Sequence, residues 1–403
     1  MCNLNIFGLY EVREETYILL IAHLYAFLFG YLVCKQRTKF KATKVILDIS
    51  YLIKNILFWI IYLSCLYFVY KLVVNQANMF ALYSLSEIRQ DFEELVLEGS
   101  GLLFYQVFAI GMFHFCNCLF IYLLFFDKSN RFFFPLFLVY SVLYALAGGG
   151  RNQFATFVYY LINFYILKDF ILSSLKGKKT IFVISAKIKI ASIIFVIISF
   201  VGMSFFSALR SDTNSEINLE SATGGLSLLS EAFVNYSIGP IVAFDRGISM
   251  KRFNDTQHLG LASFDGSENL LYHLVIKHIY SGYRRTSKEV TSWIQQNRIY
   301  IGPGKTWNYA YTSCFYYFCD FNIAGVLIMP FVLGFLFKQS ISIIENKLTI
   351  FSIALFLYIG FCFYNSVFTF YLHKTGSLIY VFILLLLNNY IGEIGNIRCH
   401  NKG

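Results

Sequence analysis

Long apolar stretches separated by short polar segments run along the whole chain. Crossing about 30 Å of hydrocarbon takes roughly 20 apolar residues in a helix. Only helices and closed barrels satisfy their backbone groups in lipid, and stretches without strict alternation favour helices. The pattern predicts an all-α polytopic integral membrane protein with about 9–11 transmembrane helices. We place spans at 16–34, 45–70, 101–126, 132–148, 152–172, 188–208, 321–337, 348–368 and 377–392.

Composition supports this class and excludes others. Apolar residues make up 57% of the 403 residues and charged residues only 14%, whereas a soluble domain carries about 25% charged residues. So few charges could not cover a soluble surface, and an aromatic content of 19% excludes disorder. The cysteines, nine in number, lie mostly in apolar runs without a C-x-x-C pair. They are therefore interpreted as small hydrophobic residues, not as a disulfide framework or a zinc site.

The excess of Lys and Arg, a net charge of +10, is interpreted as a topology signal and not as a nucleic-acid footprint. The basic residues concentrate in 35–44 and 168–189, with smaller numbers in 127–131, 338–347 and the C-terminal tail. These segments alternate along the chain, so we place them in the cytoplasm. The N-terminus is then outside and the C-terminus in the cytoplasm, and the first apolar run is interpreted as a retained span.

Residues 209–309 form the largest segment on the predicted outer side. We therefore divide the chain into N-terminal membrane helices (1–208), a mostly helical periplasmic loop (209–309), and C-terminal membrane helices with a cytoplasmic tail (310–403). Within the loop, Leu226–Phe244 contains Glu231 and Pro240 and is interpreted as an interfacial or re-entrant helix. The alternative, a further span, would reverse the orientation of everything after it.

Candidate chemistry lies at the outer ends of the predicted spans. Gly148-Gly149-Gly150 precedes Arg151 at the start of a helix, and an arginine beside a helix N-terminus is a good anion site. Arg210 lies at the same predicted depth, so the two guanidinium groups could clamp a pyrophosphate. The alternatives are a snorkelling interface arginine for Arg151 and a pair with Asp212 for Arg210.

Acidic candidates follow later in the chain. Asp245 and Arg246 interrupt an apolar segment, which indicates either a polar pocket floor or a surface ion pair. Asp320 lies where the seventh predicted span enters the membrane, among aromatic residues that suit either an interface belt or stacking on sugars. His258, in the outer loop, is a further candidate general base.

Several of these motifs resemble the Wzy-type O-antigen or capsule polymerases, the oligosaccharide repeat unit polymerase family. The resemblance rests on Tyr311-Thr312, Asp320-Phe321 after seven residues, then Gly325 and Leu333-Gly334. It also rests on Gly149-Gly150-Arg151, on 236–245 through Gly239-Pro240, and on the large loop before the Tyr-Thr segment. Asn322 stands where the family more often has glycine after Asp-Phe.

The resemblance implies a periplasmic glycosyltransferase that uses a growing glycan on undecaprenyl pyrophosphate as donor. A hydroxyl of a lipid-linked repeat unit attacks the donor's anomeric carbon, and lipid pyrophosphate leaves. Fixed cations can stabilise that leaving charge, so no metal or cofactor is expected. The expected partners are these lipid-linked glycans, the bilayer, a chain-length regulator and a flippase, and no nucleic acid.

The resemblance gives each candidate residue an expected role. Arg151, Arg210 and Arg246 are predicted to hold the pyrophosphate. Asp245, Asp320 and His258 are the predicted catalytic residues, and Tyr311, Thr312 and Tyr316 the predicted sugar-binding residues. Two other functions stay open: an O-antigen ligase, which uses the same donor with a different acceptor, and a lipid-linked oligosaccharide flippase. The absence of an internal repeat in the sequence disfavours the flippase.

Overall fold

The protein is mostly helical in the computed structural model, with two short two-stranded ladders. The structure describes residues 8–34, 44–45, 49–79, 101, 104–125, 127, 130–148, 151–176, 189–190, 192–193, 196–197, 201, 203, 238–250, 257–280, 282–296, 299–307, 312–366 and 370–400. The predicted helical class is therefore confirmed, while the number of spans stays a prediction.

The helices of the first half follow the apolar stretches of the sequence. They are α1 (Glu14–Val33), α2 (Ile49–Lys54), α3 (Ile56–Met79), the π-helical turn η2 (Tyr105–Ala109), α7 (Ile110–Phe125), the 3-10 turn η3 (Arg131–Phe133), α8 (Phe134–Ala147) and α9 (Arg151–Lys176). The predicted span 45–70 is divided at Asn55, whose side chain accepts a hydrogen bond from the Leu57 N–H at 2.9 Å. Asparagine at this position supplies the oxygen that caps a helix start.

The second half combines short elements with three long helices. The elements are a helix at 238–249, α13 (Asp265–Leu271), the π-helical turn η4 (Tyr272–Ile276), α14 (Lys277–Ile279), α15 (Thr286–Gln296), β2 (Ile299–Gly302), β3 (Lys305–Trp307), α16 (Ser313–Asn346), α17 (Ile350–Asn365), the 3-10 turn η5 (Tyr371–His373) and α18 (Thr375–His400). β2 pairs antiparallel with β3. β1 (Lys44–Val45) pairs parallel with β4 (Lys347–Leu348).

Within the described part of the chain, four helical segments are long and apolar enough to cross a membrane: Glu14–Val33, Ile56–Met79, Tyr105–Phe125 and Ser313–Asn346. Shorter apolar helices occur at Arg131–Ala147, Ile350–Asn365 and Thr375–Tyr390. On α1 and α3, large apolar side chains such as Leu32 (74% exposed) and Ile56 (77% exposed) face outward. Exposed apolar faces of this extent are compatible with a membrane protein. Most of the predicted span 188–208 lies outside the described residues.

The chain forms two compact units that do not follow the order of the sequence. Unit 1 contains Met1–Lys39, Glu231–Ser342 and Cys362–Ile379, and unit 2 contains Phe40–Ser230, Ile343–Phe361 and Tyr380–Gly403. The predicted division at 209 and 310 is one of membrane topology and stays a prediction. Unit 1 contains the first helix, the part of the predicted outer loop from Glu231 onward, and most of α16.

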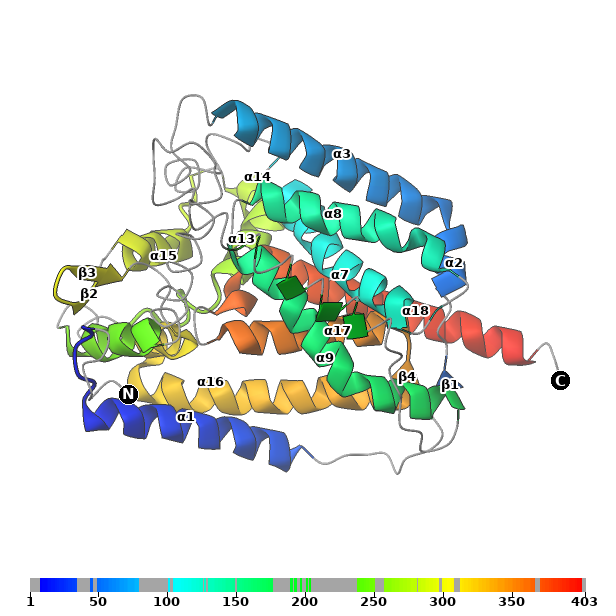
Figure 1. Cartoon of the computed structure of the whole chain (residues 1–403). Coiled ribbons are helices and arrows are strands. Elements are labelled where there is room, and N and C mark those ends of the chain that lie inside the picture. Colours follow the sequence, from blue (N-terminus) through cyan, green and yellow to red (C-terminus); the bar gives the residue numbers. More distant parts are fainter. Residues whose placement is uncertain are drawn as a thin grey trace. The chain divides into compact units, whose positions relative to one another are not determined.

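In unit 1, α1 and α16 lie side by side and run in the same direction (Figure 1). Two glycines permit the close approach, because a Cβ on Gly30 would collide with the carbonyl of Phe331, and one on Gly334 with that of Phe27. Further along the pair, Gln339 donates a hydrogen bond to the Cys34 sulfur at 3.2 Å. The predicted orientation also requires these two spans to cross the membrane in the same direction.

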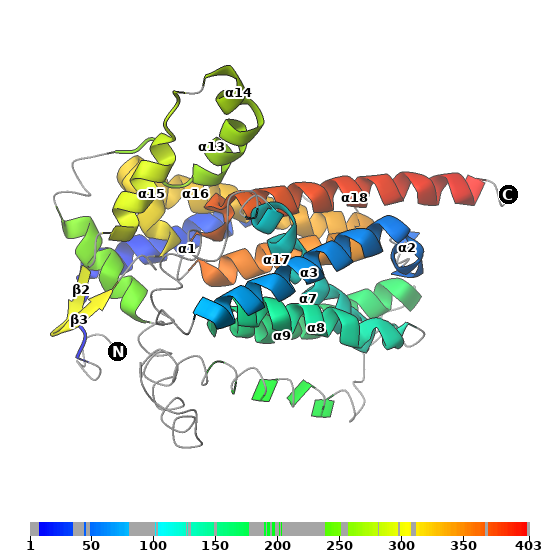
Figure 2. The same ribbon diagram turned by 90° about the horizontal axis from the view of Figure 1, so that it is seen from above.

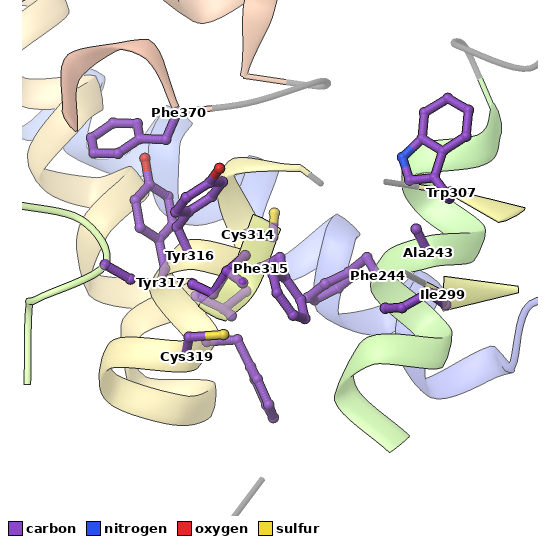
Figure 3. Packing of buried hydrophobic residues seen from close by; sticks show 14 of the residues in the cluster. Ala243, Phe244, Ile299, Trp307, Cys314, Phe315, Tyr316, Tyr317, Cys319 and Phe370 are labelled. Atoms are coloured by element: carbon purple, nitrogen blue, oxygen red, sulfur yellow. The ribbon is translucent and has the colours of Figure 1, made fainter. Parts of the chain in front are cut away.

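The core of unit 1 joins the helix at 238–249, the β2–β3 ladder and the first turns of α16. Phe244, Ile299, Phe315 and Tyr317 are completely buried in one cluster (Figure 3). α16 begins at Ser313, eight residues before the predicted start of the seventh span, because its aromatic first turns pack in this core.

Unit 2 is built around α7. Every α7 residue except Ile110 and Leu124 is buried, as expected for a helix that is apolar on all sides. α8 packs against both α7 and α3, and both views show this arrangement (Figures 1 and 2). Aromatic side chains fill the contacts, among them Phe115 and Phe351, whose rings stack at 5.5 Å.

Candidate functional site

Asp245 lies on the helix at 238–249 and is held by the start of α1. The Arg13 Nε donates to Asp245 Oδ1 at 2.9 Å, and the Arg13 Nη2 donates to the Asp245 main-chain oxygen at 2.8 Å. The Thr16 hydroxyl donates to the same Oδ1 at 2.5 Å. The Asp245 side chain is only 3% exposed. Its charge is therefore compensated by Arg13, and the alternative of a surface pair with Arg246 does not hold.

Arg246 is consequently left with an uncompensated positive charge. Its guanidinium group lies over the ring of Tyr10, with 4.4 Å between the guanidinium carbon and the ring centroid. The residue is half-buried, and its Nε is enclosed without a hydrogen-bond partner among the described residues. Within the same part of the chain, no carboxylate forms a salt bridge with Arg246. A partly desolvated arginine of this kind is suited to bind an anion.

Asp320 fastens the loop at 257–264 to α16. Its two carboxylate oxygens accept main-chain N–H groups, from Ala262 at 2.8 Å and from Ser263 at 2.7 Å. The main chain adds a bond from the Leu259 N–H to the Asp320 carbonyl at 3.1 Å. Asp320 is completely buried. This bonding is that of a residue that positions the loop.

The backbone around this contact is strained at two places. In the loop, Leu259 has a φ of 49° and Gly260 a φ of 98°, in the region that favours glycine. In α16, Phe321 and Asn322 depart from helical geometry directly after Asp320, and Asn322 has a φ of 54°. The Asn322 Oδ1 accepts the N–H of Ile323 at 2.8 Å. Asparagine tolerates positive φ better than most residues, which explains how it can occupy a position where the resembling family more often has glycine.

His258 begins the same loop. Its N–H donates to the Cys319 carbonyl at 3.0 Å, and its ring lies edge-on to Trp293 with centroids 5.5 Å apart. The ring Nε2 is enclosed without a partner in the described part of the chain. Burial lowers the pKa of the imidazole, and the nearby Asp320 carboxylate acts in the opposite direction. A neutral imidazole with an unused nitrogen can accept a proton.

The predicted sugar-binding residues lie at the start of α16. Thr312 is buried, and its carbonyl accepts the N–H of Phe315 at 2.9 Å. Tyr316 is 3% exposed, and its ring stacks on His373 with centroids 5.3 Å apart. This packing makes Tyr316 part of the core instead of an open stacking surface. Tyr311 lies outside the described residues.

Arg151 and Arg210, the other predicted members of the anion clamp, belong to the range of unit 2. α8 ends at Ala147 and α9 begins at Arg151, so a helix starts at Arg151 as predicted. The Arg151 side chain, Gly149, Gly150 and Arg210 lie outside the described part of the structure. Of the predicted site residues, Asp245, Arg246, His258, Thr312, Tyr316 and Asp320 all belong to unit 1.

Sequence reasoning missed Arg13 and Thr16. The signal available was a single cation directly before the first apolar run, which we interpreted only as a weak contribution to topology. No spacing rule connects Arg13 to Asp245, which lies 232 residues later.

Comparison of the chain with family models, with curated proteins and with solved structures finds no match. Among the described residues, no group of three or more His, Cys, Asp or Glu side chains could hold a metal ion. The candidate site therefore rests on the geometry of the side chains alone.

Proposed function

We propose that this chain is a periplasmic-face glycosyltransferase of the bacterial inner membrane, which polymerises oligosaccharide repeat units linked to undecaprenyl pyrophosphate. The observation that carries the proposal is the uncompensated Arg246. Because Arg13 neutralises Asp245, this corner of unit 1 keeps one positive charge in a partly desolvated place. A pyrophosphate leaving group requires such a charge.

In the proposed reaction, the acceptor hydroxyl oxygen attacks the anomeric carbon of the donor's first sugar. The bond from that carbon to the pyrophosphate oxygen breaks, and the acceptor's proton passes to a base. His258 suits the base, because its Nε2 has no partner among the described residues and burial favours the neutral ring. Arg246 stabilises the departing pyrophosphate.

The two carboxylates take supporting roles in this scheme. Asp320 holds the loop that begins with His258, through the Ala262 and Ser263 N–H groups. Asp245 orients the start of α1 through Arg13 and Thr16, and it precedes Arg246 on the same helix. Both are positioning residues, and the groups that act on the substrate are His258 and Arg246.

The apolar helices and the parallel α1–α16 pair support the proposed location in a membrane. A donor carried on a lipid also accounts for a site without a nucleotide-binding motif in the sequence. An outward-facing enzyme would receive its substrate from a flippase, and a chain-length regulator would act on its product.

The direct test supplies the purified full chain in nanodiscs with lipid-linked repeat units. We expect a ladder of longer lipid-linked glycans, and no ladder with Arg246→Ala. Unchanged substrate with a folded wild-type chain would reject the polymerase.

A deletion strain separates the polymerase from the ligase. Loss of a polymerase leaves lipopolysaccharide core with one repeat unit, whereas loss of a ligase leaves core alone. If the deletion strain makes lipopolysaccharide core without any repeat unit, the acceptor is the lipid core and not a lipid-linked repeat unit, and the chain is a ligase.

A further inference from the structure

A helical projection formed by α13, η4 and α14 carries apolar side chains that no core covers. Within unit 1 it extends away from α1 and α16 (Figure 2). Leu271, Leu274 and Ile279 are 56%, 66% and 80% exposed, and Val275 and Tyr280 are exposed as well. Exposed apolar side chains therefore recur along the projection, and we call these five residues the apolar strip.

The base of the projection is firmly held, so the strip is a fixed feature of the fold. Asp265 pairs with Arg285 at 2.8 Å and accepts the Ser287 hydroxyl at 2.6 Å. Glu268 accepts the Tyr283 hydroxyl at 2.6 Å and the Ser287 N–H at 2.8 Å. These bonds join the start of α13 to the start of α15 and leave the strip beyond them.

The charges next to the strip are all positive. Residues 271–284 contain Lys277 and Arg284 but no Asp or Glu, and both cations are exposed. Burial, together with Lys277 and Arg285, lowers the pKa of His273, so its ring is neutral near pH 7 while the two cations remain. An apolar strip beside basic residues is the composition of helices that lie in the headgroup region of anionic membranes.

We infer that the α13–α14 projection inserts its apolar strip into the outer-leaflet interface and binds an anionic lipid surface through Lys277 and Arg284. The inference rests on the membrane location proposed above and does not depend on glycosyl transfer. The projection begins directly after the loop that Asp320 holds. Docking on lipid would therefore fix the height of His258 at the headgroups, where a lipid pyrophosphate lies.

Tryptophan quenching by lipids with brominated acyl chains tests the insertion. The full chain is placed in nanodiscs as Ile279→Trp and as Tyr300→Trp, a matched control because Tyr300 is also exposed (61%) but lies on β2. The parent protein supplies the background of Trp59, Trp293 and Trp307. We expect stronger fractional quenching at 279 than at 300, and equal quenching at both positions would overturn the inference.

Lipid composition tests the charge. Adding phosphatidylglycerol to phosphatidylcholine should raise the ratio of docked to undocked projection by roughly fivefold for each cation. Lys277→Gln should remove one such factor. If neither phosphatidylglycerol nor Lys277→Gln changes the quenching of Ile279→Trp, the proposal that the partner is an anionic lipid surface is overturned.

A protein partner would give a different result. The Ile279→Trp side chain would then not be quenched by brominated lipids in nanodiscs but would be shielded from solvent in native membranes, and the lipid would be rejected as the partner. Neither measurement uses the polymerase substrate, so a failed polymerase assay leaves the result intact.

Discussion

Unit 1 and unit 2 both bury polar side chains, but they satisfy them by different means. Among the described residues the two buried carboxylates both lie in unit 1, beside buried neutral groups, and each has several donors: Asp245 is bonded to Arg13 and Thr16, and Asp320 to two main-chain N–H groups. Around α7 in unit 2 the buried groups are neutral. His114 meets the Tyr160 hydroxyl at 3.1 Å, and both polar atoms of the completely buried Asn117 amide find no partner in the described residues.

The contrast separates the candidate site from its scaffold. A buried carboxylate is destabilising unless its donors are arranged around it, so a chain that keeps two of them in one unit uses them for a specific arrangement. A neutral amide costs far less to enclose, and aromatic packing around α7 can offset it. We therefore place the proposed chemistry in unit 1 and expect a structural role for the α7 region.

The largest effect is expected from Arg246→Ala. Loss of the Arg246 charge should lower the proposed polymerisation rate by a factor of roughly 10²–10³, because removing one group that stabilises charge in a transition state typically lowers a rate by about this factor. Arg246→Lys should restore only part of the rate, because lysine lacks the planar fork. The measurement is glycan ladder formation by purified protein.

The control for this change is Lys288→Ala, which removes an exposed cation from α15. It should leave the ladder unchanged. Equal losses in both variants would mean that general surface charge, and not the Arg246 position, supports the reaction.

Asp320→Asn should destabilise unit 1. The amide nitrogen of asparagine would face the N–H of Ala262 or Ser263, where a carboxylate oxygen now accepts it. Bonds to a charged group contribute about 1.5–3 kcal/mol each, so we expect a loss of about 2–3 kcal/mol and earlier proteolysis within 257–264. Thermal unfolding in detergent and limited proteolysis measure both, with the exposed Glu289→Gln as control. If Asp320→Asn unfolds at the same temperature as the wild type, the stability of the loop at 257–264 does not depend on the carboxylate.

The sequence predicted the helices well because long apolar runs have few alternatives in a chain with this composition. The break between α8 and α9 at the glycine triplet was also predicted. α16 begins before the predicted span 321–337, and its helical geometry is interrupted at Phe321 and Asn322, where that span was predicted to start. The aromatic residues before Asp320 were interpreted as an interface belt or a sugar-stacking surface, but Tyr316, Tyr317 and Phe318 pack in the core of unit 1.

The site was predictable only as a set of candidates. Asp245, Arg246, His258 and Asp320 could be selected because charged or titratable residues beside apolar segments are rare. Their partners could not be found, because the donors to Asp320 are main-chain N–H groups that any non-proline residue supplies. The pairing of Arg13 with Asp245 is a product of tertiary packing over a long sequence separation, which no local pattern records.

A smaller effect is expected from pH through His258. Because burial places its folded pKa below the ordinary value of 6.5, the unfolded chain takes up the proton more readily. The contribution of His258 to the free energy of unfolding should be constant above about pH 6.5. It should fall as the pH drops from there through the lowered pKa of the folded state. The difference in unfolding midpoint between wild type and His258→Gln isolates this group, since His273 is present in both. A constant difference between pH 5 and pH 8 would contradict a buried neutral imidazole.

The smallest effect is expected from Asn117→Leu, the change that tests the other half of the comparison. Removing an enclosed amide that has no partner among the described residues removes its desolvation penalty, so leucine should leave the free energy of unfolding unchanged or raise it by up to about 1 kcal/mol. Glycan ladders should stay at the wild-type level, because α7 serves as scaffold. Cys118→Leu, at the adjacent and equally buried position, controls for volume and should destabilise by overpacking. If Asn117→Leu abolished the ladder while the protein stayed folded, the amide would belong to the reaction, and the α7 region could no longer be treated as scaffold.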